Sequence, residues 1–318
     1  MNVVDKLIEG ILRTQNPSVV GLDPDLGKIP ACYKTGVHSE DPFEAVAQVI
    51  GDFNRDLIDI VADLVPAVKP QTAFYEQYGS HGVAALEKTV AYARSKGLVV
   101  IEDAKRNDIG NTARAYAEGH LGRVELLDGS RVPAMDGDFL TVTPFLGQDS
   151  LRPFAELCKE RGKGIFVLAR TSNPGAGELQ DAVTAEGVTV TCRIAGYLSE
   201  WADASMGKYG YSSIGAVVGA TYPAQAAELR KLMPKCFFLV PGYGAQGGGA
   251  EDVLPCFNPD GLGAVVNSSR GILYPHMSDE ERMECTRGEY LAEVKKAVLN
   301  MRQNLYTCLR AQYPAMCY

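Results

Sequence analysis

The chain has 318 residues, of which 46% are hydrophobic and 22% charged, an ordinary balance for a globular protein with a large core. Its formal net charge of −8 argues against a broad surface for nucleic acid or anionic membrane, because clustered Lys and Arg hold those partners. No apolar run approaches the roughly 18 residues that a membrane span needs, and the N-terminal segment MNVVDKLIEGILRTQ lacks the core of a signal peptide. We therefore expect a cytoplasmic protein with no nucleic-acid and no membrane partner.

Cysteine and histidine usage points away from disulfides and metals. The eight cysteines are scattered without CxxC spacing, and several lie inside apolar stretches such as CFFLVPG, so buried reduced thiols are the expected state. None of the four histidines is paired at helical spacing with another ligand type. We therefore expect no metal.

In chain order, the first predicted element is an amphipathic helix within residues 1–17, whose apolar residues recur at helical spacing between charged ones. Eight short apolar runs follow, each ending in a polar or glycine-rich stretch. Their continuous β-branched character is typical of strands buried on both faces of a parallel sheet. The runs lie near residues 18–23, 65–70, 98–105, 138–144, 164–170, 214–220, 236–242 and 263–269.

Helical patterns separate these runs, at residues 41–64, 82–97, 149–162, 190–206 and 222–233. The β/α alternation favours an α/β fold of the closed (β/α)8 TIM-barrel type, with an open doubly wound sheet as the alternative. Residues 279–312 indicate a long terminal helix or a helix pair. No linker, repeat or low-complexity tract is visible, so we expect one domain over 1–318, with helical extensions at 1–17 and 279–318 packed on it.

The predicted strand ends carry the side chains of interest, because reactive groups in a (β/α)8 barrel come from the C-terminal ends of the strands and the loops after them. Five of these ends carry polar side chains. They are Asp23, then Lys69, then Asp103 with Lys105, then Thr171, Ser172 and Asn173, and finally Arg270.

The most distinctive segment is EDAKRNDIGNT, at residues 102–112. Side chains two apart on a strand point to the same face, so Asp103 and Lys105 should project together, with Asp108 on the loop that follows. Lys69, at the end of the preceding strand, should lie beside them. Charges of both signs crowded together are costly unless each is paired, and we favour a reactive cluster over the alternative, a structural ion-pair network at a barrel rim.

A second group of residues lies toward the other end of the chain. The glycine-rich segment 241–252 follows the seventh predicted strand, and NSSRGILYP, at 267–275, follows the eighth. Backbone N–H groups in such loops can approach an anion, and Arg270 can offer two hydrogen bonds to phosphate oxygens. Either loop alone could be a surface turn. Both together indicate a phosphorylated small molecule, because the loops after strands 7 and 8 are the usual phosphate site of this fold.

These motifs resemble those of the orotidine 5′-phosphate decarboxylase family, and within it the longer bacterial branch. The resemblance covers about residues 20–275, with its blocks in family order: GLDPD, AVKPQTAFYEQYG, EDAKRNDIGNT, VTPFLGQDSL, LARTSNPGAGELQ, PGYGAQGG and VNSSRGILY. It implies a TIM-barrel enzyme of pyrimidine biosynthesis that converts orotidine 5′-monophosphate (OMP) to UMP and CO2 without a cofactor.

The resemblance also implies catalytic roles. Lys69, Asp103 and Lys105 would form the charged array at the reacting carbon, with Lys105 as the proton donor to C6. Asp108 would reach in from a second subunit, together with the hydroxyl of Thr112. The expected assembly is therefore a homodimer with shared active sites.

Four further residues are similar to the family's substrate contacts. Asp23 is similar to the acceptor for a ribose hydroxyl, and Ser172 to the residue that reads the pyrimidine edge. Gln246 and Arg270 are similar to the residues that hold the phosphate. Tyr243 lies near the place of a tyrosine found in other members, but without a clear match, and we assign it no role.

Three other interpretations stay open. A Schiff-base aldolase could use Lys69 or Lys105, although a lysine flanked by carboxylates is poorly suited to being neutral. A metal-dependent sugar-phosphate epimerase or decarboxylase would carry a related DxKxxD element. A non-catalytic barrel would bind the nucleotide without turning it over. The insertion at 119–139 and the C-terminal extension exceed the compact family pattern, and we assign them no catalytic role.

Overall fold

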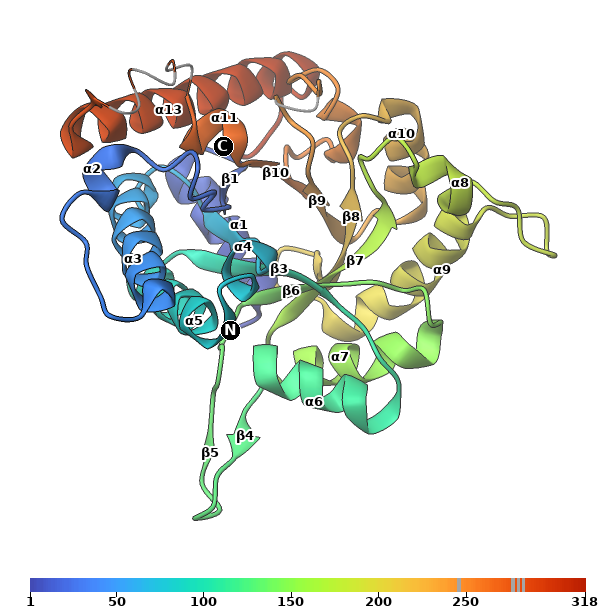
Figure 1. The fold of residues 1–318 in the computed structure, drawn as a ribbon. Helices are drawn as coiled ribbons and strands as arrows, with labels where there is room; N and C mark the ends of the chain where they lie inside the picture. The colour runs from blue at the N-terminus through green and yellow to red at the C-terminus, as the bar shows by residue number, and fades with distance from the viewer. Residues whose placement is uncertain (245–246, 276–277, 279–280, 282–283) are drawn as a thin grey trace.

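Eight parallel strands close into a barrel in the computed structural model, which describes residues 1–244, 247–275, 278, 281 and 284–318 (Figure 1). The strands are β1 (Ser18–Leu22), β2 (Ala67–Pro70), β3 (Val99–Arg106), β6 (Phe139–Val142), β7 (Gly164–Arg170), β8 (Ser212–Val218), β9 (Cys236–Val240) and β10 (Ala264–Ser268). They neighbour one another in this order, and β10 pairs back with β1. The predicted closed barrel is therefore confirmed, and the open doubly wound alternative is wrong.

The barrel interior is filled by side chains that alternate along each strand. Thr141 on β6 faces the upper interior, so Phe139, two residues earlier, lies below it on the same face. Phe139 stacks on Phe166 of β7, with 4.8 Å between the ring centroids. Gly215 on β8 leaves room for Phe166, because a Cβ there would lie 2.8 Å from its ring atoms. The lower barrel is therefore a packed core.

Helices surround the barrel on its outer side (Figure 1). The longer ones are α3 (Pro42–Val61), α5 (Gly79–Ser95), α6 (Gly110–Leu121), α7 (Gln148–Arg161), α9 (Val190–Ala202) and α10 (Pro223–Leu232). Five of the six match the predicted patterns. The spacing of apolar residues did not predict α6, because the buried face of this helix consists of only Ala113, Ala117 and Leu121. Within the described ranges, no helix is both long enough and apolar enough to cross a membrane.

The predicted N-terminal helix is α1 (Val3–Thr14), and it lies across the N-terminal ends of the strands. The backbone N–H of Val3 donates to the carbonyl of Gly162, just before β7. Lys6 Nζ donates to the carbonyl of Leu98, just before β3, and lies 3.2 Å from Asp138, just before β6. Helix α1 therefore closes the end of the barrel opposite the predicted site.

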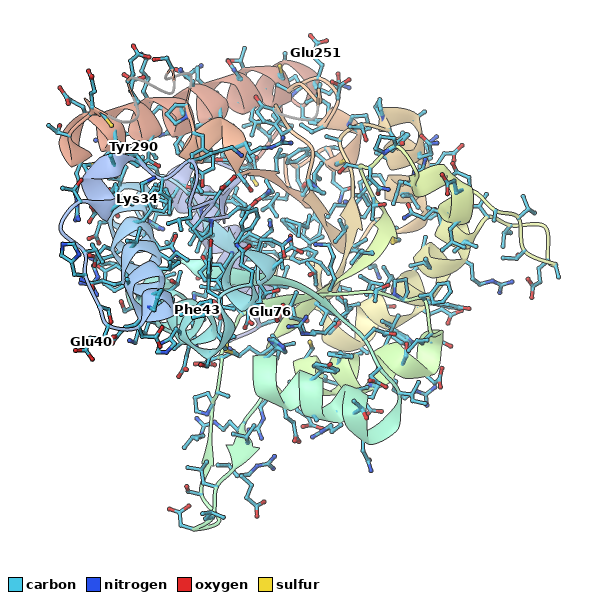
Figure 2. All side chains as sticks on the ribbon, viewed as in Figure 1. Lys34, Glu40, Phe43, Glu76, Glu251 and Tyr290 are labelled. Atoms are coloured by element: carbon cyan, nitrogen blue, oxygen red, sulfur yellow. The ribbon has the colours of Figure 1, made fainter. Side chains whose placement is uncertain are left out.

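The described part of the C-terminal extension includes the long helix α13 (Arg287–Gln312), which begins with a capping box between Thr286 and Glu289. Figure 2 shows Tyr290 beneath this helix, and the centroid of its ring lies 6.0 Å from that of Tyr33 and 5.8 Å from that of Phe53. The Tyr290 hydroxyl donates to the carbonyl of Leu273 at 2.8 Å. Helix α13 is thus packed into the side of the barrel.

The insertion at 119–139 forms the end of α6 and a two-stranded hairpin, β4 (Val124–Glu125) and β5 (Arg131–Val132), that projects from the barrel (Figure 1). Two side-chain contacts anchor the ends of this insertion. His120 Nδ1 lies 2.8 Å from the fully buried Glu102, and Lys163 Nζ donates to Asp136 at 2.9 Å. Asp136 lies just before the start of β6, so its contact with Lys163 is at the N-terminal end of the barrel.

Candidate active site

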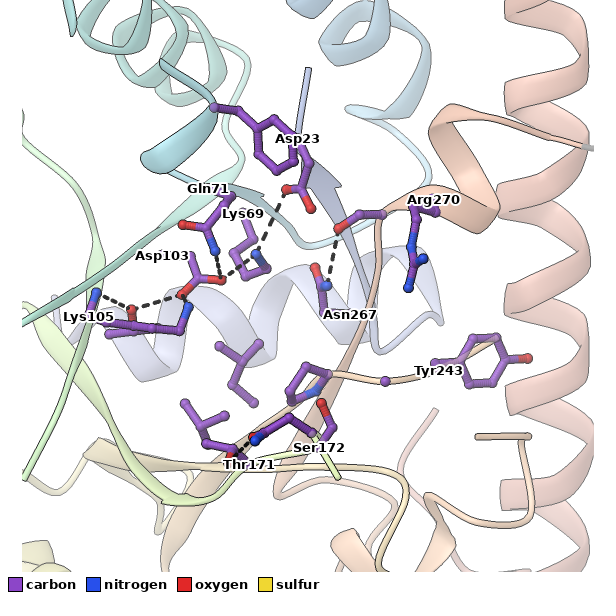
Figure 3. A pocket seen from close by; sticks show the side chains of 18 of the residues that line it. Asp23, Lys69, Gln71, Asp103, Lys105, Thr171, Ser172, Tyr243, Asn267 and Arg270 are labelled. Atoms are coloured by element: carbon purple, nitrogen blue, oxygen red, sulfur yellow. Dashed lines mark hydrogen bonds and ion pairs between the residues drawn. The ribbon is translucent and has the colours of Figure 1, made fainter. Parts of the chain in front are cut away.

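A cavity of about 540 Å³ opens at the C-terminal ends of the barrel strands (Figure 3). Six of the nine predicted site residues line it, and they come from segments spread over most of the chain. The six are Asp23, Lys69, Asp103, Lys105, Ser172 and Arg270. The barrel therefore brings together the two groups of residues that lie at opposite ends of the sequence.

Asp103 lies between the two lysines of the charged cluster (Figure 3). Its Oδ2 accepts from Lys69 Nζ at 2.6 Å, and its Oδ1 accepts from Lys105 Nζ at 2.6 Å. Asp23 adds a second carboxylate, with Oδ1 4.0 Å from Lys69 Nζ. Lys69 is 4% exposed, whereas the Lys105 side chain is 47% exposed. Lys69 is therefore fixed in the floor, and Lys105 can reach into the cavity.

A bulge in β3 shapes this cluster. The pairing of β3 with β6 shifts register between Glu102 and Arg106. Within the bulge Lys105 has a left-handed backbone, with φ +50°, and its N–H donates to Thr141 Oγ1 at 3.0 Å. A left-handed residue other than glycine costs about 1–2 kcal/mol, and such strain is concentrated at functional sites.

Mutual pairing keeps the buried groups of the cluster charged. Burial by itself raises the pKa of the Asp103 carboxyl, but the ammonium groups of Lys69 and Lys105 outweigh it and hold this pKa well below its ordinary value. Burial by itself lowers the pKa of Lys69, but the charges of Asp103 and Asp23 outweigh it and raise this pKa. A Schiff-base mechanism on Lys69 needs a neutral amine, which this environment disfavours.

Two neutral side chains complete the hydrogen bonds of Asp103, and the sequence did not single them out. Gln71 Nε2 donates to Oδ2 at 3.1 Å, and Thr141 Oγ1 donates to Oδ1 at 3.0 Å. Gln71 follows Lys69 by two residues, and Thr141 lies on β6, the strand next to β3. The two-residue alternation could have found both as inward-facing positions.

The opposite side of the cavity holds the predicted phosphate contacts. Arg270 begins the short helix α11 (Arg270–Leu273), directly after β10. Tyr243 follows β9 and also lines the cavity, but its ring points toward α13, and it borders a second cavity together with Asn304 of that helix (Figure 3). Gln246 lies outside the described residues.

Gln180 of α8 (Ala176–Gln180) forms hydrogen bonds with the loop that carries Ser172. The backbone N–H of Thr171 donates to Gln180 Oε1 at 2.9 Å, and Gln180 Nε2 donates to Thr171 Oγ1 at 2.8 Å. Ser172 is therefore presented at the cavity wall by a fixed turn.

Tyr274 lines the rim of the cavity and contacts the loop after β1. The sequence did not predict this contact. Its hydroxyl donates to the carbonyl of Asp23 at 3.0 Å and accepts from the N–H of Asp25 at 2.8 Å. Lys28, which pairs with Asp25 at 2.7 Å, adds another cation to the lining. Tyr274 thus fixes the backbone that carries Asp23.

Asp108 and Thr112 do not line this cavity. Asp108 lies on the loop between β3 and α6, where its carboxylate accepts from the N–H of Ile109 at 2.8 Å. Thr112 is exposed in the first turn of α6. A single chain therefore does not bring these two residues to the charged cluster.

Comparison with known proteins agrees with this arrangement. The sequence model of the orotidine 5′-phosphate decarboxylase / HUMPS family matches residues 24–279. A protein of Rhodopirellula baltica named orotidine 5′-phosphate decarboxylase is 45% identical over 305 residues, covering 96% of this chain and 99% of that protein. A Clostridium tetani protein of the same name is 38% identical, covering 98% of this chain and all of that protein. The solved structure of Leishmania donovani OMP decarboxylase superposes with a TM-score of 0.68 at 27% identity, covering 95% of this chain and 99% of that one. The chain belongs to the orotidine 5′-phosphate decarboxylase / HUMPS family.

Proposed function

We propose that the chain is a carboxy-lyase that binds OMP in this cavity and converts it to UMP and CO2. The observation that carries the proposal is the ion-paired row Lys69–Asp103–Lys105 in the floor of a cavity whose opposite wall holds Arg270. The matches to relatives with this name over nearly the whole chain support the same reaction.

Loss of CO2 leaves the electron pair of the broken bond on C6 of the pyrimidine ring, where no conjugated carbonyl group accepts it. The site must therefore stabilise a localised negative charge by electrostatics. The ammonium of Lys105 is placed for this, since its side chain is half exposed to the cavity and held by one hydrogen bond to Asp103. Lys105 then donates a proton to C6 and regains one from solvent.

Asp103 has the role of holding both ammonium groups in place. Because its carboxylate bonds Lys69 and Lys105 at the same time, neither lysine has to reorganise as charge develops. Asp23 would accept a ribose hydroxyl and Ser172 would read the pyrimidine edge. Arg270 would hold the phosphate, with Gln246 as its expected partner.

We propose a homodimer in which Asp108 and Thr112 complete the active site of the partner subunit. Support comes from their position outside the cavity of their own chain and from the apolar side chains beside them. Ile109 is 58% exposed and Phe145, on the loop after β6, is 73% exposed. Asn107, on the loop after β3, donates to Ser150 in the first turn of α7, the helix that follows the loop of Phe145, so the segments that carry Ile109 and Phe145 lie side by side.

We also propose that the enzyme works in the cytoplasm on free nucleotide. The eight cysteines are all unbridged, which fits a reducing compartment. The substrate and the product are small anions that a soluble enzyme can take directly from solution.

The deciding experiment follows the near-ultraviolet absorbance of OMP in the presence of the purified protein, with and without EDTA. The proposal expects loss of OMP, formation of UMP and no effect of EDTA. Activity that EDTA abolishes would favour a metal-dependent relative. Binding of UMP without any turnover of OMP would favour a non-catalytic barrel, and borohydride trapping of a carbonyl substrate would favour an aldolase.

A further inference from the structure

Asn267 is a buried amide in the catalytic cavity to which no role has yet been given. It lies near the C-terminal end of β10, is 7% exposed and lines the cavity (Figure 3). The sequence analysis did not identify Asn267, because its side chain is neutral and the neighbouring candidates are charged. Its surroundings, however, leave it incompletely bonded.

The side-chain oxygen of Asn267 has no hydrogen-bond donor among the described residues. Asn267 Nδ2 makes one long contact, 3.4 Å to Ser269 Oγ. Asn267 Oδ1 is fully buried and accepts no hydrogen bond from the described part of the chain. Buried amide oxygens nearly always have a donor, because leaving one unpaired costs its full desolvation. Asn267 lines the cavity, so a rotation of its side chain lets a ligand supply that donor.

The neighbouring strand is built to make room for this group. A Cβ at Gly21 on β1 would lie 1.8 Å from Ser269 Oγ and 3.3 Å from Asn267 Oδ1. A side chain at Gly21 would therefore displace Ser269 and crowd the amide. The glycine lets both side chains lie against β1 and face the cavity.

The position of the amide identifies the part of the ligand it meets. β10 lies between β1, which leads to Asp23, and β9, which leads to Pro241 and the phosphate side. Arg270 follows Asn267 by three residues. The amide thus lies between the charged cluster and the proposed phosphate contact, where the sugar of a nucleotide must pass. The only hydrogen-bond donors on that sugar are its hydroxyl groups.

We infer that Asn267 Oδ1 accepts a hydrogen bond from a ribose hydroxyl, so that Asn267 selects ribonucleotides over their deoxy analogues. The inference rests on the proposed function, since it takes a pyrimidine nucleotide as the ligand. It adds a neutral specificity residue to a site whose other sugar contact, Asp23, is charged.

The test measures binding of UMP, 2′-deoxyUMP and 3′-deoxyUMP by calorimetry to the wild type and to Asn267→Ala. The wild type should bind UMP more tightly than both deoxy analogues. The variant should lose about tenfold in affinity for UMP and for one of the analogues, and nothing for the other, which lacks the hydroxyl that Asn267 contacts. Asn300→Ala is the matched control, because Asn300 is an exposed asparagine of α13 that lines a different cavity.

Equal losses for all three ligands, or no loss for any, would overturn the inference. Circular dichroism establishes that Asn267→Ala is folded, and Asn267→Ser replaces it if the alanine variant is not. Failure of the proposed function gives a different result, because a wild type that binds UMP without consuming OMP leaves the pattern of binding losses intact.

Discussion

Asp103 and Lys105 form an ion pair of 2.6 Å although they are only two residues apart on one strand and Lys105 has a left-handed backbone. The pair leaves the lysine half exposed, while the other carboxylate oxygen holds the buried Lys69. One carboxylate thus fixes two ammonium groups at different depths. The buried Lys69 helps to stabilise the fold, and the half-exposed Lys105 can act on a ligand in the cavity.

The first prediction concerns Lys105. Replacing it with alanine should lower kcat for OMP by at least about 10³-fold, because both the charge opposite C6 and the proton donor are removed. Unfolding in urea should change little, since the side chain is half exposed. Lys208→Ala is the control, because Lys208 is an exposed, ion-paired lysine whose partner, Glu9, lies on α1, at the opposite end of the barrel. Near-normal turnover by Lys105→Ala would remove this lysine from the mechanism.

The second prediction concerns Asp103. Asp103→Asn should reduce the free energy of unfolding by about 3 kcal/mol, because it leaves the buried Lys69 without its nearest countercharge. Asp203→Asn, which breaks an exposed pair with Lys235, should cost at most about 1 kcal/mol. Urea unfolding followed by circular dichroism measures both. Equal losses of unfolding free energy in the two variants would show that the buried ion pair stabilises the fold no more than the exposed one.

The third prediction is the pH dependence of that difference. The pKa of Asp103 is lower in the folded state, so its stabilisation is complete above about pH 4 and is lost as the pH falls through the folded pKa. The pKa of Lys69 is raised, so its stabilisation is complete below about pH 10 and is lost as the pH rises through the folded pKa. The free-energy difference between the wild type and Asp103→Asn should therefore shrink below about pH 4, where Asp103 of the wild type becomes protonated. It should also shrink at alkaline pH, because burial without Asp103 lowers the pKa of Lys69 in the variant and the amine can lose its charge. A difference that stays unchanged below about pH 4 would contradict this assignment.

Much of the barrel could be predicted because strands buried on both faces have continuous apolar sequences that end abruptly. The strand ends then placed Lys69, Asp103 and Lys105 together, since parallel strands all end on the same rim. The bulge at Lys105 could not be predicted, because its left-handed backbone depends on pairing between β3 and β6 and not on a local glycine. Helix α6 was missed because small alanines give almost no apolar periodicity.

The site was less predictable than the fold where its residues are neutral or are brought together from distant parts of the sequence. Gln71 and Asn267 carry no charge, so only their inward positions identify them. Tyr274 reaches the rim through a contact with Asp23, which lies 251 residues away in the sequence. Asp108 could be identified by its spacing in the motif, but no property of a single chain tests the proposal that it completes a partner's cavity.

The fourth prediction concerns Arg270. Arg270→Ala should raise KM for OMP and weaken binding of UMP by about 10- to 100-fold, because a charge-assisted contact to the phosphate is removed. Binding of uridine, which has no phosphate, should not change. Arg152→Ala, at an exposed position of α7, is the matched control. A parallel loss for UMP and uridine would show that Arg270 acts elsewhere than at the phosphate.

The last prediction tests the shared active site by mixing inactive subunits. Lys105→Ala and Asp108→Ala dimers should each be inactive, and a heterodimer of the two should contain one site in which both residues are intact. Random exchange at equal amounts should therefore restore about a quarter of the wild-type activity, since half of the dimers are mixed and each has one good site of two. Lys69→Ala mixed with Lys105→Ala is the control. Both lysines line the cavity of one chain, so every site in that mixture lacks one of them and no activity should return. Recovery in neither mixture, despite subunit exchange verified by mass spectrometry, would mean that Asp108 acts within its own chain.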